Sequence, residues 1–299
     1  MIKWPFKKVI KLSDPSLKSD TFEAEIYRRA SELHNRYTKF GLYPRDLGVW
    51  DEKHLRKLDV SLFRSDNVYV WQTRELNEVN YLVSYLAAKL LDKSNLFDSI
   101  SESGEFGVEI YQFGEVNVSR DLLDSILEIN FLIEIVGLEA FSKMKVLDIG
   151  AGYGRLAKNL ARIFPEIKIG CVDSIPISTA ISEFYLKDEI SLSQVRVYSI
   201  DEIDKISYRS FDLVTNIHSF SEMSIDSVET WISFIRKLGV PNVFVIPNPK
   251  ELRLNTGQDF EAIFNKYGYV VRQKMSKYPV GIEEKYLLYP SNYFYLELE

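Results

Sequence analysis

The segment Lys145–Arg155 has the sequence Lys-Val-Leu-Asp-Ile-Gly-Ala-Gly-Tyr-Gly-Arg, and it decides the fold of this chain of 299 residues. An apolar run that carries one acid, Asp148, predicts a buried strand, and glycine then takes every second position from Gly150 to Gly154. Apolar residues at helical spacing follow directly, as far as Phe164. This order predicts a strand, a tight turn and a helix N-terminus. There a ligand can approach bare backbone, and unpaired N–H groups favour an anion.

Strands and helices alternate from this segment to the end of the sequence. Strands separated by helical lengths predict a mostly parallel sheet with helices on both faces. The last two strands are separated by a loop without a helical pattern, which allows an antiparallel pair at the sheet edge. We expect strands at Lys145–Ile149, Lys168–Asp173, Val195–Ile200, Phe211–Asn216, Asn242–Pro247, Tyr269–Gln273 and Tyr293–Leu298. We expect helices at Gly154–Phe164, Ile175–Leu186, Ser227–Leu238 and Thr256–Lys266.

The N-terminal part of the sequence has a different pattern. Helical periodicity marks Asp20–Phe40 and Glu75–Leu91, and it returns at Ser119–Leu138. Three glycines among short alternating segments in Ser101–Val118 indicate a hairpin or a binding loop. We therefore expect a mainly helical N-terminal cap, an acceptor-binding region, at residues 1–118 and an α/β core at residues 119–299.

The composition limits the class of protein. Hydrophobic residues make up 46% and charged residues 27% of the chain, an ordinary globular balance. A net charge of −6 disfavours a nucleic-acid partner, although a local basic patch stays open. Cys171 is the only cysteine, which excludes an intrachain disulfide and a cysteine-based zinc site. Without a signal peptide pattern or a membrane-spanning run, we expect a cytoplasmic protein with no membrane insertion. The oligomeric state stays open, a homo-oligomer included.

Acidic residues follow the second and third strands of the core. Asp173 ends the second strand, about 25 residues after Asp148, where an acid can accept hydrogen bonds from a ribose diol. The third strand ends in Ser199-Ile200-Asp201, which offers Ile200 to the face of an adenine and Asp201 to its exocyclic amine. The glycine turn alone serves NAD, FAD and S-adenosylmethionine alike. A nicotinamide cofactor fits less well, because the third glycine comes one place too early for Gly-x-Gly-x-x-Gly.

Taken together, these residues resemble class I S-adenosylmethionine-dependent methyltransferases over roughly Ser119–Glu299. The resemblance implies a Rossmann-like, seven-stranded, mostly parallel sheet with a reversed last strand, and S-adenosylmethionine as cofactor. It implies that Asp148 and the glycine turn hold the methionine end of the cofactor, Asp173 the ribose and Asp201 the adenine. Asn216 would lie near the methionine moiety. The cofactor-binding residues carried over in this way are Asp148, Gly150, Ala151, Gly152, Tyr153, Gly154, Asp173, Ser174, Ile200, Asp201 and Asn216.

Two segments are similar to a narrower family, the sugar O-methyltransferases of bacterial polysaccharide gene sets. They are Asp148-Ile-Gly-Ala-Gly-Tyr-Gly-Arg-Leu-Ala and Asn216-Ile-His-Ser-Phe-Ser-Glu-Met. This resemblance implies methyl transfer to a hydroxyl of a nucleotide sugar, a glycan terminus or a glycosylated metabolite. The alternatives are a protein, lipid or other small-molecule acceptor, or a cofactor-binding scaffold without activity. A nucleic-acid methyltransferase is disfavoured, because Asn-Ile-His-Ser replaces the Asn/Asp-Pro-Pro-Tyr/Phe motif expected there.

A sugar hydroxyl is a poor nucleophile at neutral pH, so a general base is useful. His218 follows the fourth strand, and an ordinary histidine is mostly neutral at pH 7. If the chain turns helical there, Glu222 lies on the same face, where it orients the imidazole or acts as the base itself. The competing interpretations are a packed histidine for His218, a helix cap or solvated charge for Glu222, and a loop acid for Asp201. We find no acidic cluster suited to a metal and expect none to be bound.

Overall fold

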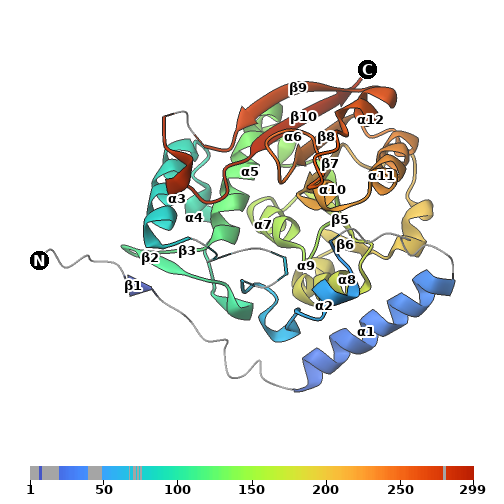
Figure 1. Cartoon of the computed structure of the whole chain (residues 1–299), viewed down its shortest axis with the longest axis horizontal. Helices are drawn as coiled ribbons and strands as arrows, with labels where there is room; N and C mark the ends of the chain where they lie inside the picture. Colours follow the sequence, from blue (N-terminus) through green and yellow to red (C-terminus); the bar gives the residue numbers. More distant parts are fainter. Residues whose placement is uncertain are drawn as a thin grey trace, which may run out of the picture. The chain divides into compact units, whose positions relative to one another are not determined.

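The computed structural model describes residues 7–8, 20–39, 49–66, 68–69, 72, 74, 76–278 and 281–299. The chain divides into two compact units, and each is built from separated segments. Unit 1 comprises the residues up to Ala24, His54–Leu138 and Tyr278–Pro290. Unit 2 comprises Glu25–Lys53, Glu139–Lys277 and Ser291–Glu299. Figure 1 labels most of the helices and strands of both units.

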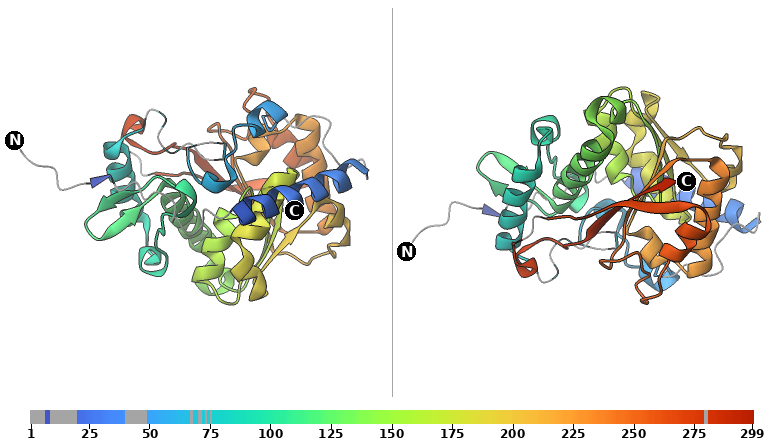
Figure 2. Two further views of the ribbon diagram at one scale, coloured as in Figure 1. Left: turned by 90° about the horizontal axis from the view of Figure 1, so that it is seen from below. Right: turned by 90° about the horizontal axis from the view of Figure 1, so that it is seen from above.

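A seven-stranded sheet is the core of unit 2 (Figures 1 and 2). Its strands are β4 (Lys145–Ile149), β5 (Lys168–Val172), β6 (Val195–Tyr198), β7 (Leu213–Ile217), β8 (Asn242–Ile246), β9 (Tyr269–Ser276) and β10 (Asn292–Leu298). Their order is β6-β5-β4-β7-β8-β10-β9. The five strands from β6 to β8 run parallel, and β10 is antiparallel to both β8 and β9. The predicted Rossmann-like sheet with a reversed last strand is therefore confirmed.

Apolar residues explain the position of β4 in this sheet. Val146, Leu147 and Ile149 have no exposed surface, and β4 pairs with β5 on one side and β7 on the other. A parallel strand covered on both faces is expected to carry such a nearly continuous apolar run. The carboxyl ends of the parallel strands meet at one edge of the sheet, so the residues after β4, β5, β6 and β7 come together there.

Helices follow the strands of unit 2. The helices after β4 are α7 (Arg155–Ile163), α8 (Pro176–Tyr185), α9 (Lys187–Ser191), α10 (Ser219–Glu222), α11 (Ile225–Leu238) and α12 (Glu261–Lys266). Helix α7 contacts β5, α8 and α9 contact β6, and α12 contacts β9. The helix expected from Thr256 begins only at Glu261. Gly257 takes a left-handed φ of 91°, and the Asp259 carboxylate accepts the Glu261 N–H, so the helix starts after this turn.

Helix α1 (Asp20–Lys39) belongs to unit 2 from Glu25 onward. Its buried face repeats at helical spacing and comprises Ile26, Ala30, Leu33 and Tyr37. On the same helix, Arg29 donates through two nitrogens to the carboxylate of Glu183 in α8, both at 2.7 Å. The two panels of Figure 2 show α1 in blue beside the strands and helices of unit 2. The expected helix is confirmed over these residues, and its expected last residue, Phe40, lies outside the described residues.

Unit 1 combines helices with a small antiparallel sheet. Helix α3 (Glu78–Leu91) contacts α5 (Arg120–Val136), and the hairpin β2–β3 (Tyr111–Phe113 and Val116–Val118) pairs with β1 (Lys7–Lys8). The hairpin is one of the two structures expected for this region. The expected start of α3 at Glu75 lies outside the described residues. The remaining short elements of unit 1 are η2 (Val60–Leu62), α4 (Leu96–Ser99), η3 (Glu105–Gly107) and η5 (Glu284–Tyr286). Helices α2 (Glu52–Leu55) and α6 (Leu138–Phe141) include residues of both units, and η4 (Ile200–Lys205) belongs to unit 2.

The segment Tyr278–Pro290 joins unit 1 through α3. The Asn80 side chain donates to the Lys285 carbonyl at 2.8 Å, and the Ser84 hydroxyl accepts the Leu288 N–H at 2.8 Å. Asn80 and Ser84 are both buried. A piece of chain that lies between β9 and β10 in sequence therefore completes the core of unit 1.

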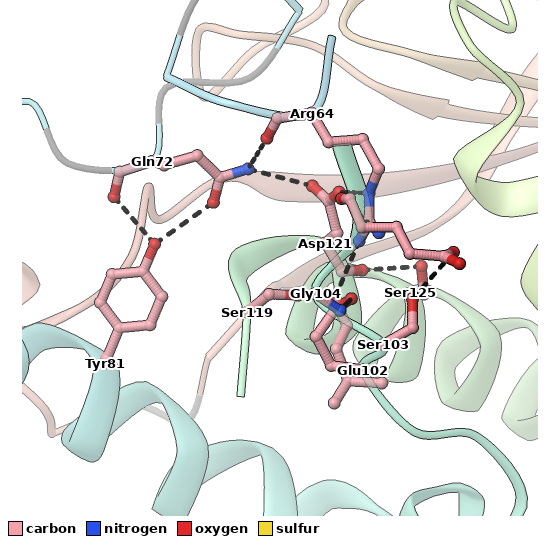
Figure 3. A network of polar contacts seen from close by, with 11 residues as sticks. Arg64, Gln72, Tyr81, Glu102, Ser103, Gly104, Ser119, Asp121 and Ser125 are labelled. Atoms are coloured by element: carbon pink, nitrogen blue, oxygen red, sulfur yellow. Dashed lines mark hydrogen bonds and ion pairs between the residues drawn. The ribbon is translucent and has the colours of Figure 1, made fainter. Parts of the chain in front are cut away.

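A buried polar network holds the centre of unit 1 (Figure 3). Arg64 donates to Asp121 at 2.9 Å and to Glu102 at 2.8 Å, and all three side chains are at most 5% exposed. Gln72 donates to the second oxygen of Asp121 at 3.3 Å, and the Tyr81 hydroxyl donates to the Gln72 carbonyl at 2.8 Å. Burial raises the pKa of Glu102, but Arg64 outweighs this effect and holds it below its ordinary value. One guanidinium thus serves two buried carboxylates.

Candidate active site

The glycine turn after β4 depends on backbone that only glycine adopts readily. Gly150, Gly152 and Gly154 have φ values of 73°, 58° and 90°. A Cβ atom on Gly150 would lie 2.1 Å from the Ser219 Oγ, and one on Gly154 would lie 2.5 Å from Leu186 Cδ1. Both contacts are too short for any real Cβ atom. The turn therefore brings bare backbone against the start of α10 and directs α7 away from the strand.

Asp173 connects the end of β5 to this turn. Its Oδ2 accepts the Gly152 N–H at 3.0 Å, and its Oδ1 accepts the Ile175 N–H at 2.8 Å. Burial raises the pKa of Asp173 to about 7; the two N–H groups lower it, and the nearby Glu222 raises it. The carboxyl thus lies beside the turn and titrates near neutral pH.

Asp148 is the second buried acid of the site. Its Oδ1 accepts a hydrogen bond from the Thr215 hydroxyl at 2.7 Å. Burial raises the pKa of Asp148 to about 6; Thr215 and Arg155 lower it, and Asp173 raises it. The ionised forms of these two neighbouring carboxyls, at the ends of β4 and β5, are therefore destabilised by burial. A cationic ligand near them would stabilise the ionised forms.

Asn216 lies at the end of β7, next to the glycine turn. Its amide donates to the Ile149 carbonyl at 2.8 Å, and its Oδ1 accepts the Phe220 N–H at 2.9 Å. The side chain has no exposed surface. Asn216 thus links β7 to the end of β4 and accepts an N–H of the first turn of α10. The sequence did not predict this structural role.

Three further residues predicted from the sequence lie in the same region. The Ala151 N–H donates to the Val172 carbonyl, and the Tyr153 ring is buried against the Tyr185 ring with centroids 5.6 Å apart. Ser174 follows Asp173 at the end of β5. Tyr153 therefore packs into the protein, whereas the Ala151 backbone and Ser174 stay at the rim of the sheet.

Asp201 follows β6 and is held by α1. Arg36 donates to its Oδ2 from Nε at 2.9 Å and from Nη2 at 2.5 Å. Burial raises the pKa of Asp201, but hydrogen bonds from Ser199 and Arg36 outweigh it and hold the pKa below its ordinary value. The other oxygen, Oδ1, is buried and has no hydrogen-bond partner among the described residues. Next to it, the Ile200 N–H donates to the Tyr37 hydroxyl at 3.2 Å.

Glu222, the last residue of α10, is held by two neutral donors. The Trp50 indole N–H donates to one carboxylate oxygen at 2.8 Å, and the Asn248 amide donates to the other at 3.1 Å. Burial raises the pKa of Glu222, and these two hydrogen bonds lower it without reversing the shift. The raised pKa makes Glu222 a better proton acceptor than an ordinary glutamate.

His218 precedes α10 and does not belong to it. Its φ and ψ are 66° and −31°, outside the helical region, and its N–H donates to the Ile246 carbonyl at 2.6 Å. The helical backbone on which the expected pairing with Glu222 depends therefore does not extend to His218, and only Glu222 lies in the helix. The strained backbone of a residue with a β-carbon is typical of functional sites.

Sequence reasoning missed several residues that contact the predicted ones, among them Arg36, Tyr37, Trp50 and Asn248. Arg36 and Asp201 are 165 residues apart in sequence, and Trp50 and Glu222 are 172 apart. Only Tyr37 carried a signal, since it continues the apolar face of α1. Contacts over such separations leave no local pattern.

These side chains fit an adenosine ligand with a cationic end. The free Oδ1 of Asp201 lacks only a donor, which an exocyclic amine supplies, and Asp173 can accept from a ribose diol. The raised pKa values of Asp148, Asp173 and Glu222 fit a nearby positive charge. Among the described residues, no group of three or more His, Cys, Asp or Glu could hold a metal ion. No described helix is long and apolar enough to cross a membrane.

Residues 120–237 match the family model described as Methyltransferase small domain. This segment includes the glycine turn, Asp173, Asp201 and Glu222. Together with the strand order of unit 2, the match supports a class I methyltransferase. The same match supports S-adenosylmethionine as the cofactor. No curated protein matches the chain.

Solved structures of methyltransferases resemble part of this protein. The mitomycin 7-O-methyltransferase is 16% identical, with a TM-score of 0.42 over 60% of this chain and 57% of that chain. A SAM-dependent methyltransferase from Aquifex aeolicus is 18% identical, with a TM-score of 0.40 over 52% and 83%. Magnesium protoporphyrin IX methyltransferase from Synechocystis, with bound SAM, is 13% identical, with a TM-score of 0.45 over 76% and 100%. The matched part of this protein thus spans little more than half of the mitomycin enzyme.

Proposed function

We propose that this protein is an S-adenosylmethionine-dependent O-methyltransferase that acts on a sugar hydroxyl. The acceptor is a nucleotide sugar, a glycan terminus or a glycosylated metabolite. The sugar class is supported by the resemblance of the segments that begin at Asp148 and Asn216 to sugar O-methyltransferases. Residues 1–118 are assigned to acceptor binding, and the reaction is assigned to the cytoplasm.

The observation that supports methyl transfer to an oxygen atom is the surroundings of the Glu222 carboxyl. Its side chain is half-buried, its pKa is raised, and its two oxygens accept hydrogen bonds from the neutral donors Trp50 and Asn248. No cation among its partners holds it as a permanent anion. A carboxyl of this kind can take up the proton that a hydroxyl loses when it is methylated.

When bound, S-adenosylmethionine supplies an electrophilic methyl group. We assign Asp148 and the glycine turn to the methionine end, Asp173 to the ribose and Asp201 to the adenine. Glu222 removes the hydroxyl proton, and His218, at the end of β7, orients the hydroxyl or shares this role. Holding the acceptor in line with the methyl group contributes up to about 7–11 kcal/mol to such a displacement.

The test is a transfer assay with labelled cofactor and a panel of nucleotide sugars, glycans, peptides, lipids and small alcohols. We expect labelled sugar with the natural chain. Glu222→Gln should lower kcat by about 10²–10⁴-fold and leave the affinity for S-adenosylhomocysteine unchanged. Glu229→Gln is the matched control, because Glu229 lies on α11 and pairs with Lys266 at the surface.

Each other outcome has a definite meaning. Labelled peptide or lipid without labelled sugar would contradict the sugar acceptor. Cofactor binding without transfer to any acceptor would indicate a scaffold. Full activity of Glu222→Gln would remove Glu222 as the base, and His218→Ala then tests the remaining candidate.

A further inference from the structure

Helix α1 contacts Asp201, the acid that we assign to the adenine, through the side chain of Arg36. Both donating nitrogens of Arg36 bind the same carboxylate oxygen, Oδ2 of Asp201, and Nη2 also reaches the Ser199 hydroxyl at 3.1 Å. An arginine commonly binds both oxygens of a carboxylate, one with each nitrogen. Here the second oxygen, Oδ1, stays without a partner although it is buried.

The free oxygen can only accept a hydrogen bond. A protonated carboxyl could donate from this atom, but the contacts from Ser199 and Arg36 keep the pKa of Asp201 below its ordinary value. An ionised carboxylate is acceptor-only. Adenine presents an amine donor at its 6-position, whereas hypoxanthine presents a carbonyl oxygen there, which would face Oδ1 acceptor to acceptor.

Other contacts hold α1 without Arg36. Arg29 binds Glu183 through two nitrogens, and the fully buried Tyr37 accepts the Ile200 N–H through its hydroxyl. The apolar face of α1 is also buried. Loss of the Arg36 guanidinium should therefore leave the helix in place and change only the orientation and charge of Asp201.

We propose that Arg36 is a positioning residue that makes this site select adenine, because it occupies Oδ2 of Asp201 and leaves an ionised Oδ1 for the exocyclic amine. The proposal rests on S-adenosylmethionine as the ligand of the site. Arg36 is 165 residues from Asp201 in sequence and lies outside the matched segment 120–237. Base selection thus depends on a helix that precedes the methyltransferase domain.

Binding of two product analogues tests this role without any turnover. Isothermal titration calorimetry measures the dissociation constants of S-adenosylhomocysteine and of its deaminated form, S-inosylhomocysteine. We expect the natural chain to prefer the adenosyl compound by about 100-fold or more, since a site built around a hydrogen bond strongly rejects a ligand that cannot form it. Arg36→Met should reduce this ratio about tenfold, mainly through weaker binding of S-adenosylhomocysteine.

Two further variants separate positioning from docking of the helix. Arg29→Met removes the ion pair between α1 and Glu183 and should leave the ratio unchanged. Asp201→Asn should abolish the preference, and adding Arg36→Met to it should have no further effect on the ratio.

The outcomes distinguish this proposal from the proposed function. An unchanged ratio in Arg36→Met would overturn the role of Arg36, and so would an equal fall in Arg29→Met, which would assign the effect to helix docking. If the natural chain bound neither compound, the cofactor site of the proposed function would itself be wrong.

Discussion

Replacement of Asp148 by asparagine is expected to stabilise the unliganded protein at pH 8. The pKa of Asp148 is about 6 in the folded protein, compared with an ordinary value of 3.8. A raised carboxyl pKa means that the folded state binds more protons than the unfolded state between these pH values. Its stabilising contribution is complete below pH 4 and is lost as the pH rises through about 6.

The shift of about two pKa units corresponds to about 3 kcal/mol of unfolding free energy, at about 1.36 kcal/mol per unit. Asparagine carries no charge and still offers Oδ1 to the Thr215 hydroxyl, so it avoids this loss. For a chain of this size, about 3 kcal/mol raises the melting temperature by about 5–10 °C. The same variant should bind S-adenosylmethionine more weakly, because it removes the carboxylate that we propose for the methionine end of the cofactor.

The assay is thermal unfolding followed by circular dichroism between pH 4 and pH 8. The informative quantity is the difference between variant and natural chain, in which the titration of all other groups cancels. We expect this difference to be near zero at pH 4, to grow up to pH 6 and to stay constant above pH 7. Asp204→Asn, at a position 81% exposed, serves as control and should show no such change. A difference that is absent at pH 8, or equal at every pH, would refute the reasoning.

Other perturbations follow from the same contacts. Arg64→Met leaves Glu102 and Asp121 buried without their cation and should cost about 3–5 kcal/mol in urea unfolding; a loss below 1 kcal/mol would show that the network is dispensable. Gly150→Ala should abolish cofactor binding in calorimetry, because its Cβ would meet Ser219; Ser219→Gly in the same chain should restore part of it, and no restoration would count against this clash. Methyl transfer should survive EDTA, and its loss, reversed by a divalent metal, would contradict the metal-free site.

Local sequence patterns were sufficient for the sheet of unit 2. The strand Lys145–Ile149 matches β4 at both ends, because an apolar run that ends at a glycine turn has clear limits. The helix expected from Thr256 was placed too early, since its apolar spacing continues through Gly257, where the backbone leaves the helical region. The spacing of apolar residues alone does not show where a turn interrupts a helical pattern.

The candidate site was predictable only where it follows strand ends. Asp173 lies beside the glycine turn as expected, because parallel strands bring their carboxyl ends together. The partners Arg36 and Trp50 come from segments more than 160 residues away from the acids they contact. The pairing of His218 with Glu222 was expected from helical spacing, but the backbone of His218 is not helical. A single sequence gives no signal for these contacts.

The segment Tyr278–Pro290, held by Asn80 and Ser84 of α3, determines when unit 1 can complete its fold during synthesis on the ribosome. Synthesis at about 5–20 residues per second takes roughly 8–30 s to proceed from Leu138 to Pro290. During this interval the nascent unit 1 lacks the strand-to-strand connection that completes it, and its exposed apolar surface needs protection. Truncation before Tyr278 would leave unit 1 permanently in this state, so a fragment limited to residues 1–138 should aggregate.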